Sequence, residues 1–303
     1  MLKKIVFTLD EESLKNKEVS ESMESAKAYI KSCGLDSEIL GAQDFFKIHK
    51  PDGEMLVVAD RKEISERATK EGFYVIGVEH VLNRNEEFPG VKYIFSDIDE
   101  VDIDSFIKAY QRYAKEPWDV LTTDRLLVRE TTLDDVDEFY KLYKDPEMTR
   151  YMEGLFENPE DEKRYQKDYI EKVYGLMGFG IWTLVRRSDG RVIGRVGYSV
   201  RNGFDDIELG FLIGKEFQRQ GYAFEACNAV LDYGRDILLF DKVQTLVKAE
   251  NEISINLCKK LGFEYLDTVS VEEDIYGREY NGENSVPVGG ASYGEYVRLM
   301  KRL

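Results

Sequence analysis

The chain has 303 residues, of which 43% are apolar, and a formal net charge of −17 at pH 7. This length suffices for two domains that each bury a core. A general excess of acidic side chains argues against nucleic-acid binding, because phosphates would be repelled. The apolar runs fall far short of the roughly 18 residues of a membrane span, and the first residues lack a signal-peptide pattern. We therefore expect a cytoplasmic protein that contacts neither nucleic acid nor membrane.

Cysteine and histidine are scarce. The three cysteines, Cys33, Cys227 and Cys258, are widely spaced, and the only histidines are His49 and His80. An odd number of isolated cysteines argues against a disulfide framework. Two histidines far apart in the sequence are poor candidates for a zinc site or a Ser-His triad. We predict no metal site.

The first 119 residues alternate between strand and helix patterns. Such alternation predicts an α/β domain with a mainly parallel sheet and helices on its faces. Strands are predicted over 3–9, 54–60, 73–79 and 91–97, and helices over 20–34, 61–72 and 102–116. Pro117 disfavours helix at the residue before it, so we place a domain boundary near residue 120. The predicted domains are 1–119 and 120–303.

The second domain has a different order of elements. Strands are predicted over 125–132, 206–214, 242–250, 263–271 and 296–303, with a hairpin of two strands around the Asp-Gly pair within 180–200. Helices are predicted over 133–145, 160–177 and 253–262, and another follows the turn at 216–226 and runs to about 238. The polar, Gly-rich residues 277–295 are predicted to form a long hairpin loop.

The segment EFQRQGYAFEA at 216–226 links a predicted strand to a predicted helix. The first amides of a helix have no intrahelical partner and lie at the positive end of its dipole, so they favour an anion. Gly221 allows a ligand close to the backbone, and Gln218, Arg219 and Gln220 add donors. The turn alone leaves two interpretations open, a helix-start glycine or a phosphate-binding turn.

Two further segments accompany this turn, TDRLLVRETTLDD at 123–135 and AENEISINLCKKLGFEYLD at 249–267. Together with ELGFLIGKEFQRQGYAFEA at 208–226, they resemble the Gcn5-related N-acetyltransferases (GNAT family), in particular the ribosomal-protein and spermidine acetyltransferase branch. The resemblance covers residues 124–303. It implies a GNAT fold with a mixed, mostly antiparallel central sheet, and acetyl-CoA as the co-substrate.

The resemblance also implies which residues hold coenzyme A. The family's [QR]xxGx[GA] segment corresponds to Gln218, Arg219, Gln220, Gly221, Tyr222 and Ala223, whose amides would bind the pyrophosphate. The strand before it would pair with the pantetheine arm through Phe211, Leu212 and Ile213, where two parallel strands part. Asn251 and Ser254, which match the family's Asn-x-x-Ser, would lie beside the same arm.

The sequence matches the family less well at the catalytic positions than at the coenzyme A positions. Glu208 lies where spermidine-type relatives carry a glutamate, and we expect it to act as a general base or to anchor a cationic substrate; the alternative is a solvated strand carboxylate. Many relatives place a tyrosine acid seven residues after the asparagine, but this chain has Cys258 there. Glu153, Trp182 and Arg195 could face the acceptor pocket, although a surface or core position is the simpler interpretation of each.

The start of the first domain, KIVFTLD at 4–10, resembles the opening motif of haloacid dehalogenase-like hydrolases, and residues 47–78 resemble a later part of that family. Thr8 stands where the family's nucleophilic Asp would be, which removes the central group of a phosphatase. Asp10, Lys50 and Asp60 could still line a crevice at the carboxyl ends of the strands. We therefore interpret this domain as a degenerate one with a role in packing, oligomerisation or recognition.

From these patterns we expect an N-acetyltransferase. It would move an acetyl group from acetyl-CoA to a primary amine, either a small cationic amine or a protein N-terminus, by direct attack in a ternary complex. Two alternatives stay open, a CoA-binding module without turnover and a phosphatase in the first domain. A homodimer is also left open.

Overall fold

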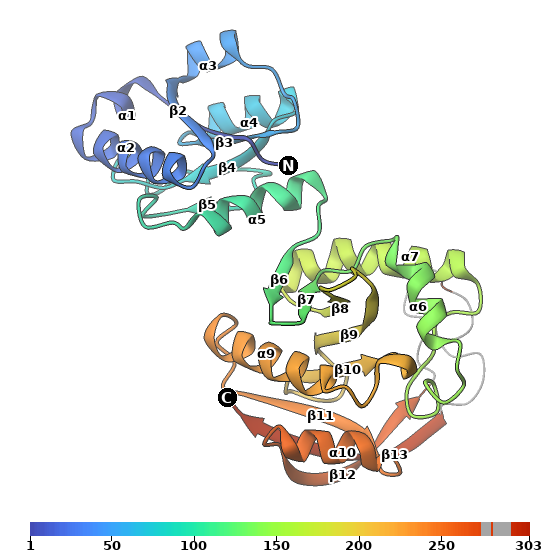
Figure 1. Cartoon of the computed structure of the whole chain (residues 1–303). Coiled ribbons are helices and arrows are strands. Elements are labelled where there is room, and N and C mark those ends of the chain that lie inside the picture. Colours follow the sequence, from blue (N-terminus) through green and yellow to red (C-terminus); the bar gives the residue numbers. More distant parts are fainter. Residues whose placement is uncertain (274–279, 281–291) are drawn as a thin grey trace. The chain divides into compact units, whose positions relative to one another are not determined.

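The computed structural model describes residues 1–273, 280 and 292–303. The chain divides into two compact units, Met1–Glu116 and Pro117–Leu303 (Figure 1). Each unit has its own sheet and its own buried apolar clusters.

The N-terminal unit is built on a five-stranded parallel sheet. Its strand order is β2-β1-β3-β4-β5, and every pair is parallel. This confirms the predicted parallel α/β architecture. The strands are β1 (Lys4–Leu9), β2 (Asp36–Gly41), β3 (Met55–Ala59), β4 (Tyr74–Val78) and β5 (Ile94–Phe95).

Helices cover both faces of this sheet (Figure 1). Residues of β1 alternate between the two faces, so that Ile5 and Phe7 pack with α2 and α5, whereas Val6 packs with α3 and α4. Burial on both faces is what a parallel sheet requires, and it explains the nearly continuous apolar run of β1. The helices are α1 (Glu11–Lys15), α2 (Lys17–Ser32), α3 (Ala42–Ile48), α4 (Lys62–Glu71) and α5 (Ile103–Ala114).

Three elements of this unit were not predicted, namely α1, β2 and α3. Strand β2 is a sheet edge with only Ser37 buried, so its sequence, DSEILG, lacks the apolar character of the central strands. Helix α2 begins three residues before the predicted start because the Asn16 side chain accepts a hydrogen bond from the Val19 amide at 3.1 Å and caps it.

The C-terminal unit contains an eight-stranded mixed sheet in the order β12-β13-β11-β10-β9-β8-β7-β6. The pair β10 and β11 is parallel, and the other neighbouring pairs are antiparallel. The predicted mixed, mostly antiparallel sheet is confirmed. The strands are β6 (Asp119–Thr122), β7 (Leu126–Arg129), β8 (Ile181–Arg186), β9 (Val192–Ser199), β10 (Glu208–Ile213), β11 (Lys242–Lys248), β12 (Glu264–Glu273) and β13 (Ser292–Arg302).

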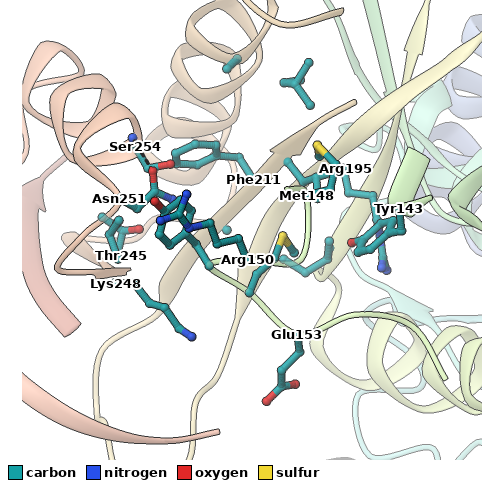
Figure 2. Close-up of a pocket in the computed structure, with 18 of the residues that line it drawn as sticks. Tyr143, Met148, Arg150, Glu153, Arg195, Phe211, Thr245, Lys248, Asn251 and Ser254 are labelled. Carbon is teal, nitrogen blue, oxygen red and sulfur yellow. Dashed lines mark hydrogen bonds between the residues drawn. The ribbon is translucent and has the colours of Figure 1, made fainter. Parts of the chain in front are cut away.

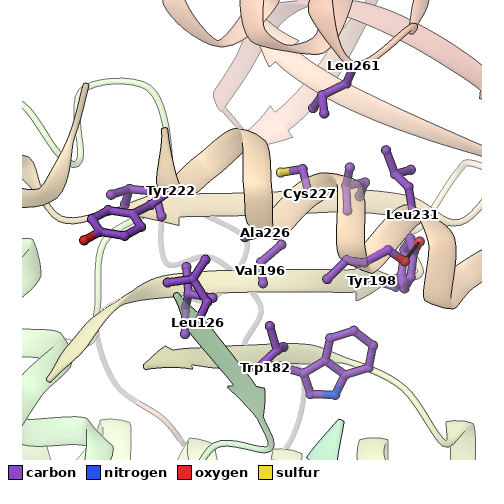
Figure 3. Close-up of a cluster of buried hydrophobic side chains, with 14 of the residues drawn as sticks. Leu126, Trp182, Val196, Tyr198, Tyr222, Ala226, Cys227, Leu231 and Leu261 are labelled. Carbon is purple, nitrogen blue, oxygen red and sulfur yellow. Dashed lines mark hydrogen bonds between the residues drawn. The ribbon is translucent and has the colours of Figure 1, made fainter. Parts of the chain in front are cut away.

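The two faces of this sheet have different covers. On one face, Ala226 and Cys227 of α9 pack over Val196 and Tyr198 (Figure 3), and the Tyr198 hydroxyl donates to the Val230 carbonyl at 2.8 Å. On the other face, Phe139 of α6 stacks against Arg195. The helical segments are α6 (Asp135–Tyr143), α7 (Pro159–Tyr169), the π-turn η1 (Ile170–Tyr174), α8 (Gly175–Met177), the 3₁₀ turn η2 (Lys215–Phe217), α9 (Tyr222–Asp236) and α10 (Glu252–Lys260).

Two predicted segments of this unit differ in detail. The single helix expected over 160–177 is α7 followed by η1 and α8, with Pro159 in its first turn and Asn158 as its cap. The hairpin loop expected over 277–295 lies largely outside the described residues. Of that range, Ser292 to Glu295 belong to β13, which pairs antiparallel with β12.

None of the helices within the described ranges has the length and apolar character that a bilayer crossing requires. The described residues also contain no group of three or more His, Cys, Asp or Glu side chains placed to hold a metal ion.

Candidate active site

A cavity of about 1,080 Å³ opens where the two parallel strands of the C-terminal unit part. Strands β10 and β11 pair at Glu208 and Gln244 and then separate toward Ile213. Figure 2 shows part of the lining. The predicted site residues that line the cavity are Glu208, Phe211, Leu212, Ile213, Gln218, Arg219, Gly221, Tyr222, Ala223, Asn251 and Ser254. Gln220 is the predicted residue that does not.

The turn between β10 and α9 has the conformation of an anion site. Arg219 and Gly221 both adopt left-handed backbone angles, with φ of +60° and +83°. Gly221 is the N-cap of the 15-residue helix α9 and has no side chain that could accept from the first amides. Those amides therefore stay available at the positive end of the helix.

Arg125, which was not among the residues selected from the sequence, holds this turn in place from outside the cavity. Its Nε donates to Glu225 at 2.6 Å, and its Nη1 donates to the Gln220 carbonyl at 2.9 Å. The guanidinium also lies 4.5 Å from the centre of the Tyr222 ring. The Gln220 carbonyl is thus held away from the cavity, and no local pattern could reveal a contact between residues 95 positions apart.

Asn251 and Ser254 come together as a helix cap. The Asn251 side chain accepts a hydrogen bond from the Ser254 amide at 3.2 Å and caps α10. Both residues are also on the cavity wall, where Figure 2 labels them. The Asn-x-x-Ser spacing thus caps the start of α10, and this structural role does not depend on a ligand.

Glu208 lies at the point where the strands part, and its side chain is only 9% exposed. Burial raises the pKa of its carboxyl group, and the nearby Arg201 guanidinium opposes that shift. The Arg201 Nε donates to Glu208 Oε2 at 2.7 Å. The Leu246 amide also donates to the carboxylate. A buried carboxyl group with a raised pKa can accept a proton from a reacting amine.

The other candidates divide between cavity and core. Glu153 and Arg195 line the cavity. Trp182 does not, because it is 1% exposed and packs edge-on against Tyr198 and Tyr233 in the core. Its position on β8 puts it on the face covered by α9, away from Arg195. The suggestion that Trp182 faces the acceptor is therefore wrong.

Cys258 also belongs to the core. Its side chain is fully buried in the apolar cluster beneath α10, and it is not part of the cavity wall. Burial raises the pKa of its thiol to about 12. The thiol therefore stays protonated at neutral pH and has no contact with the cavity.

In the N-terminal unit, two of the predicted crevice residues, Asp10 and Asp60, contact each other, and Lys50 does not join them. Asp10 caps α1 through the Ser13 amide at 2.8 Å and accepts from Arg61 Nε at 2.5 Å. Asp60 is fully buried and accepts from the Asp10 amide at 3.1 Å. Thr8 is also fully buried, and its hydroxyl has no partner among the described residues. Lys50 is exposed between α3 and β3.

Comparison with known proteins identifies the C-terminal unit. Residues 125–264 match the model of the acetyltransferase (GNAT) domain. The uncharacterized N-acetyltransferase p20 of Bacillus licheniformis is 29% identical over 152 residues, which cover 48% of this chain and 83% of p20. The uncharacterized N-acetyltransferase YoaA of Bacillus subtilis is 28% identical over 174 residues, which cover 55% of this chain and 91% of YoaA.

Among solved structures, the ribosomal-protein-S5-alanine acetyltransferase from Vibrio fischeri aligns with a TM-score of 0.46 and 16% identity, over 60% of this chain and 95% of that one. The domain match spans most of the elements that line the cavity, from β7 to α10. Residues 125–264 are therefore a GNAT acetyltransferase domain, and the chain is an N-acetyltransferase of the acyltransferase class.

Proposed function

We propose that the C-terminal unit binds acetyl-CoA in this cavity and transfers the acetyl group to a primary amine, either a small cationic amine or a protein N-terminus. The separation of β10 and β11 carries this proposal. Beyond Glu208 the inner edge of β10 has no strand to pair with. The main-chain groups of Phe211, Leu212 and Ile213 that face away from β9 would pair with the amide groups of a pantetheine arm, apart from the Ile213 carbonyl, which accepts from Gln218.

The geometry of the cavity wall supports the remaining contacts that we propose. The first amides of α9, from Tyr222 and Ala223, would hold the pyrophosphate, and Gln218 and Arg219 would lie beside it. The Gln218 Nε2 donates to the Ile213 carbonyl at 2.9 Å, which ties the turn to the end of β10. Asn251 and Ser254 would contact the arm from α10.

Glu208 would supply the proton acceptor. As the amine nitrogen attacks the thioester carbonyl, a C–N bond forms, the C–S bond breaks and the coenzyme A thiolate leaves. The proton released from the nitrogen would pass to the Glu208 carboxylate, directly or through a water molecule. Holding both reactants at the gap between the strands lowers the barrier through orientation.

A substitution at the turn tests the cofactor site. In Gly221→Trp the new side chain would fill the space over the first amides of α9, and we expect acetyl-CoA to lose its stabilisation of the protein against heat. Gly34→Trp is the matched control, since Gly34 has a similar φ of +90° with open space around it and lies in the other unit. Strain alone would affect both variants, whereas loss of the site affects only Gly221→Trp.

Turnover is tested with a panel of primary amines and the release of free coenzyme A. An equal acetyl-CoA shift in the wild type and Gly221→Trp would refute the proposed binding site. Binding of acetyl-CoA without coenzyme A release from any amine would instead favour a binding module without turnover.

A further inference from the structure

Arg195 is a cation of the cavity wall that has no carboxylate partner within residues 1–273, 280 and 292–303. It extends from β9, and its guanidinium lies 4.5 Å from the centre of the Phe139 ring. Its Nε is buried and makes no hydrogen bond in the described part of the chain. Arginine stays charged at any physiological pH. A partly buried charge without a counterion is costly.

The groups around Arg195 are tyrosines. Tyr143, Tyr165, Tyr169 and Tyr174 all interact with its charge, and the guanidinium donates a hydrogen bond to the Tyr143 hydroxyl. Figure 2 shows Tyr143 and Arg195 together at one end of the cavity. Burial raises the pKa of Tyr143 and of Tyr174, so these side chains are neutral at pH 7 and do not balance the charge.

The three buried carboxylates of the covering helices, Asp135, Asp161 and Glu162, are engaged elsewhere. Asp161 forms an ion pair with Arg164. Asp135 receives both terminal nitrogens of Arg129 at 2.7 Å, together with the Thr183 hydroxyl at 3.0 Å. Glu162 accepts from the Phe156 amide at 3.2 Å and from Gln166 at 2.8 Å. None of the three forms an ion pair with Arg195 among the described residues, and Arg195 lines the cavity.

Strand register places Arg195 on the same side of the sheet as Glu208. Glu208 pairs with Ser199 and Leu212 pairs with Arg195, so all four side chains share one face. Arg195 and Ser199 are four residues apart, which corresponds to roughly 13 Å along the strand. A molecule whose amine lies near Glu208 can therefore extend a second group toward Arg195 along this face.

We propose that Arg195 binds a carboxylate of the acceptor, and that the acceptor is a small amine with a carboxylate at its other end. The planar guanidinium presents paired donors that match a carboxylate, and Tyr143, Tyr165 and Tyr169 line the cavity beside it. The inference rests on the proposed function, because it assigns the far end of the same acceptor site. It favours a zwitterionic acceptor over a polyamine.

The test compares unbranched ω-amino carboxylates of three to six carbons with alkylamines of the same length, at saturating acetyl-CoA. Hydrogen bonds to charged groups correspond to roughly 10- to 100-fold in binding, so the wild type should show a kcat/KM for the best amino carboxylate higher by this factor. In Arg195→Met the preference should disappear, while kcat/KM for the alkylamine changes less than about threefold. Arg195→Lys should keep part of the preference.

Arg150→Met is the matched control, because Arg150 is an exposed cation of the same cavity. Its removal should leave the preference intact. Equal rates for both classes in the wild type would overturn the proposal. So would an equal loss for both classes in Arg195→Met, or a preference that depends on Arg150.

Direct binding separates this inference from the proposed function. Should no amine be turned over, the amino carboxylates are titrated calorimetrically into the coenzyme A complex. Binding by the wild type but not by Arg195→Met supports the carboxylate site without any turnover. No binding by the wild type overturns it. Failure of acetyl-CoA itself to bind, with an unchanged melting temperature, would count against the proposed function instead.

Discussion

Both units have charged side chains at the places where strands end or separate. The units differ in whether those charged side chains have partners within the unit. In the N-terminal unit, a cavity of about 570 Å³ is bordered by Asp10 and Arg61, which are paired with each other. In the C-terminal unit, Arg195 has no carboxylate partner in the described residues, and the first amides of α9 have no cap. Buried polar groups in proteins are normally hydrogen bonded. A polar group without a hydrogen-bond partner beside a cavity is therefore better evidence of a ligand site than burial of the group alone.

Asp60 illustrates the satisfied case. It is fully buried like a catalytic carboxylate, yet its oxygens accept from the Asp10 amide and lie 3.4 Å from His80 Nε2. The Leu82 amide donates to His80 Nδ1, which leaves Nε2 as the ring nitrogen that can donate to Asp60. Each group has a partner within the unit, which is the arrangement expected of a structural network.

The largest expected effect is on the chemistry at Glu208. Glu208→Gln keeps the shape of the side chain but cannot accept a proton, and we expect kcat to fall by roughly 10²- to 10⁴-fold. The acidic limb of the kcat/KM profile, which reports deprotonation of the free enzyme's base, should disappear. Coenzyme A release measured from pH 5 to 9 checks both effects, and a change of less than threefold would remove Glu208 from the catalytic role.

Arg201 provides the control for this assignment. Its guanidinium lowers the pKa of Glu208, and removing it in Arg201→Met should raise that pKa further. A base must be deprotonated to act, so the acidic limb should move to higher pH. A purely structural role for the pair would lower activity without moving the limb.

The next effect concerns stability in the N-terminal unit. Asp60→Ala leaves the Asp10 amide and His80 without their acceptor, and we expect a loss of about 3 kcal/mol in the unfolding free energy of that unit. Acetyl-CoA binding should not change, because the contacts of Asp60 lie within residues 1–116. Denaturant unfolding and acetyl-CoA titration of the same variant measure the two quantities. A catalytic Asp60 would show the reverse, with stability retained or raised on substitution.

The sequence predicted those features of the site that depend on local pattern. The run from Gln218 to Ala223 combines a glycine with the start of a helix, and both are visible within a few residues. The contacts of Arg125 and Arg201 could not be predicted in this way. Arg125 reaches Glu225 across 100 positions, and Arg201 reaches Glu208 through the pairing of β9 with β10. Such contacts depend on strand register, which short patterns do not specify.

Short sequence patterns also limited the prediction of the fold, because they do not show where a strand lies in the sheet. Apolar runs such as β1 and β3 were predicted because both faces of a central strand are buried. Strand β2, at the sheet edge, carries polar residues and was missed. Trp182 was considered for the acceptor pocket because its strand was expected to line it, with a surface or core position as the simpler interpretation. Alternation along β8 places it in the core.

The smallest expected effect tests the thiol that stands where many relatives carry a tyrosine. Cys258 packs beneath α10 away from the cavity, and burial raises the pKa of its thiol to about 12. Cys258→Ala should therefore leave kcat within about twofold between pH 7 and 10 and cost about 1 kcal/mol of stability through lost packing. Coenzyme A release and thermal unfolding measure these effects. A tenfold fall in kcat would show that the thiol reaches the leaving group, which would require the core beneath α10 to open during the reaction.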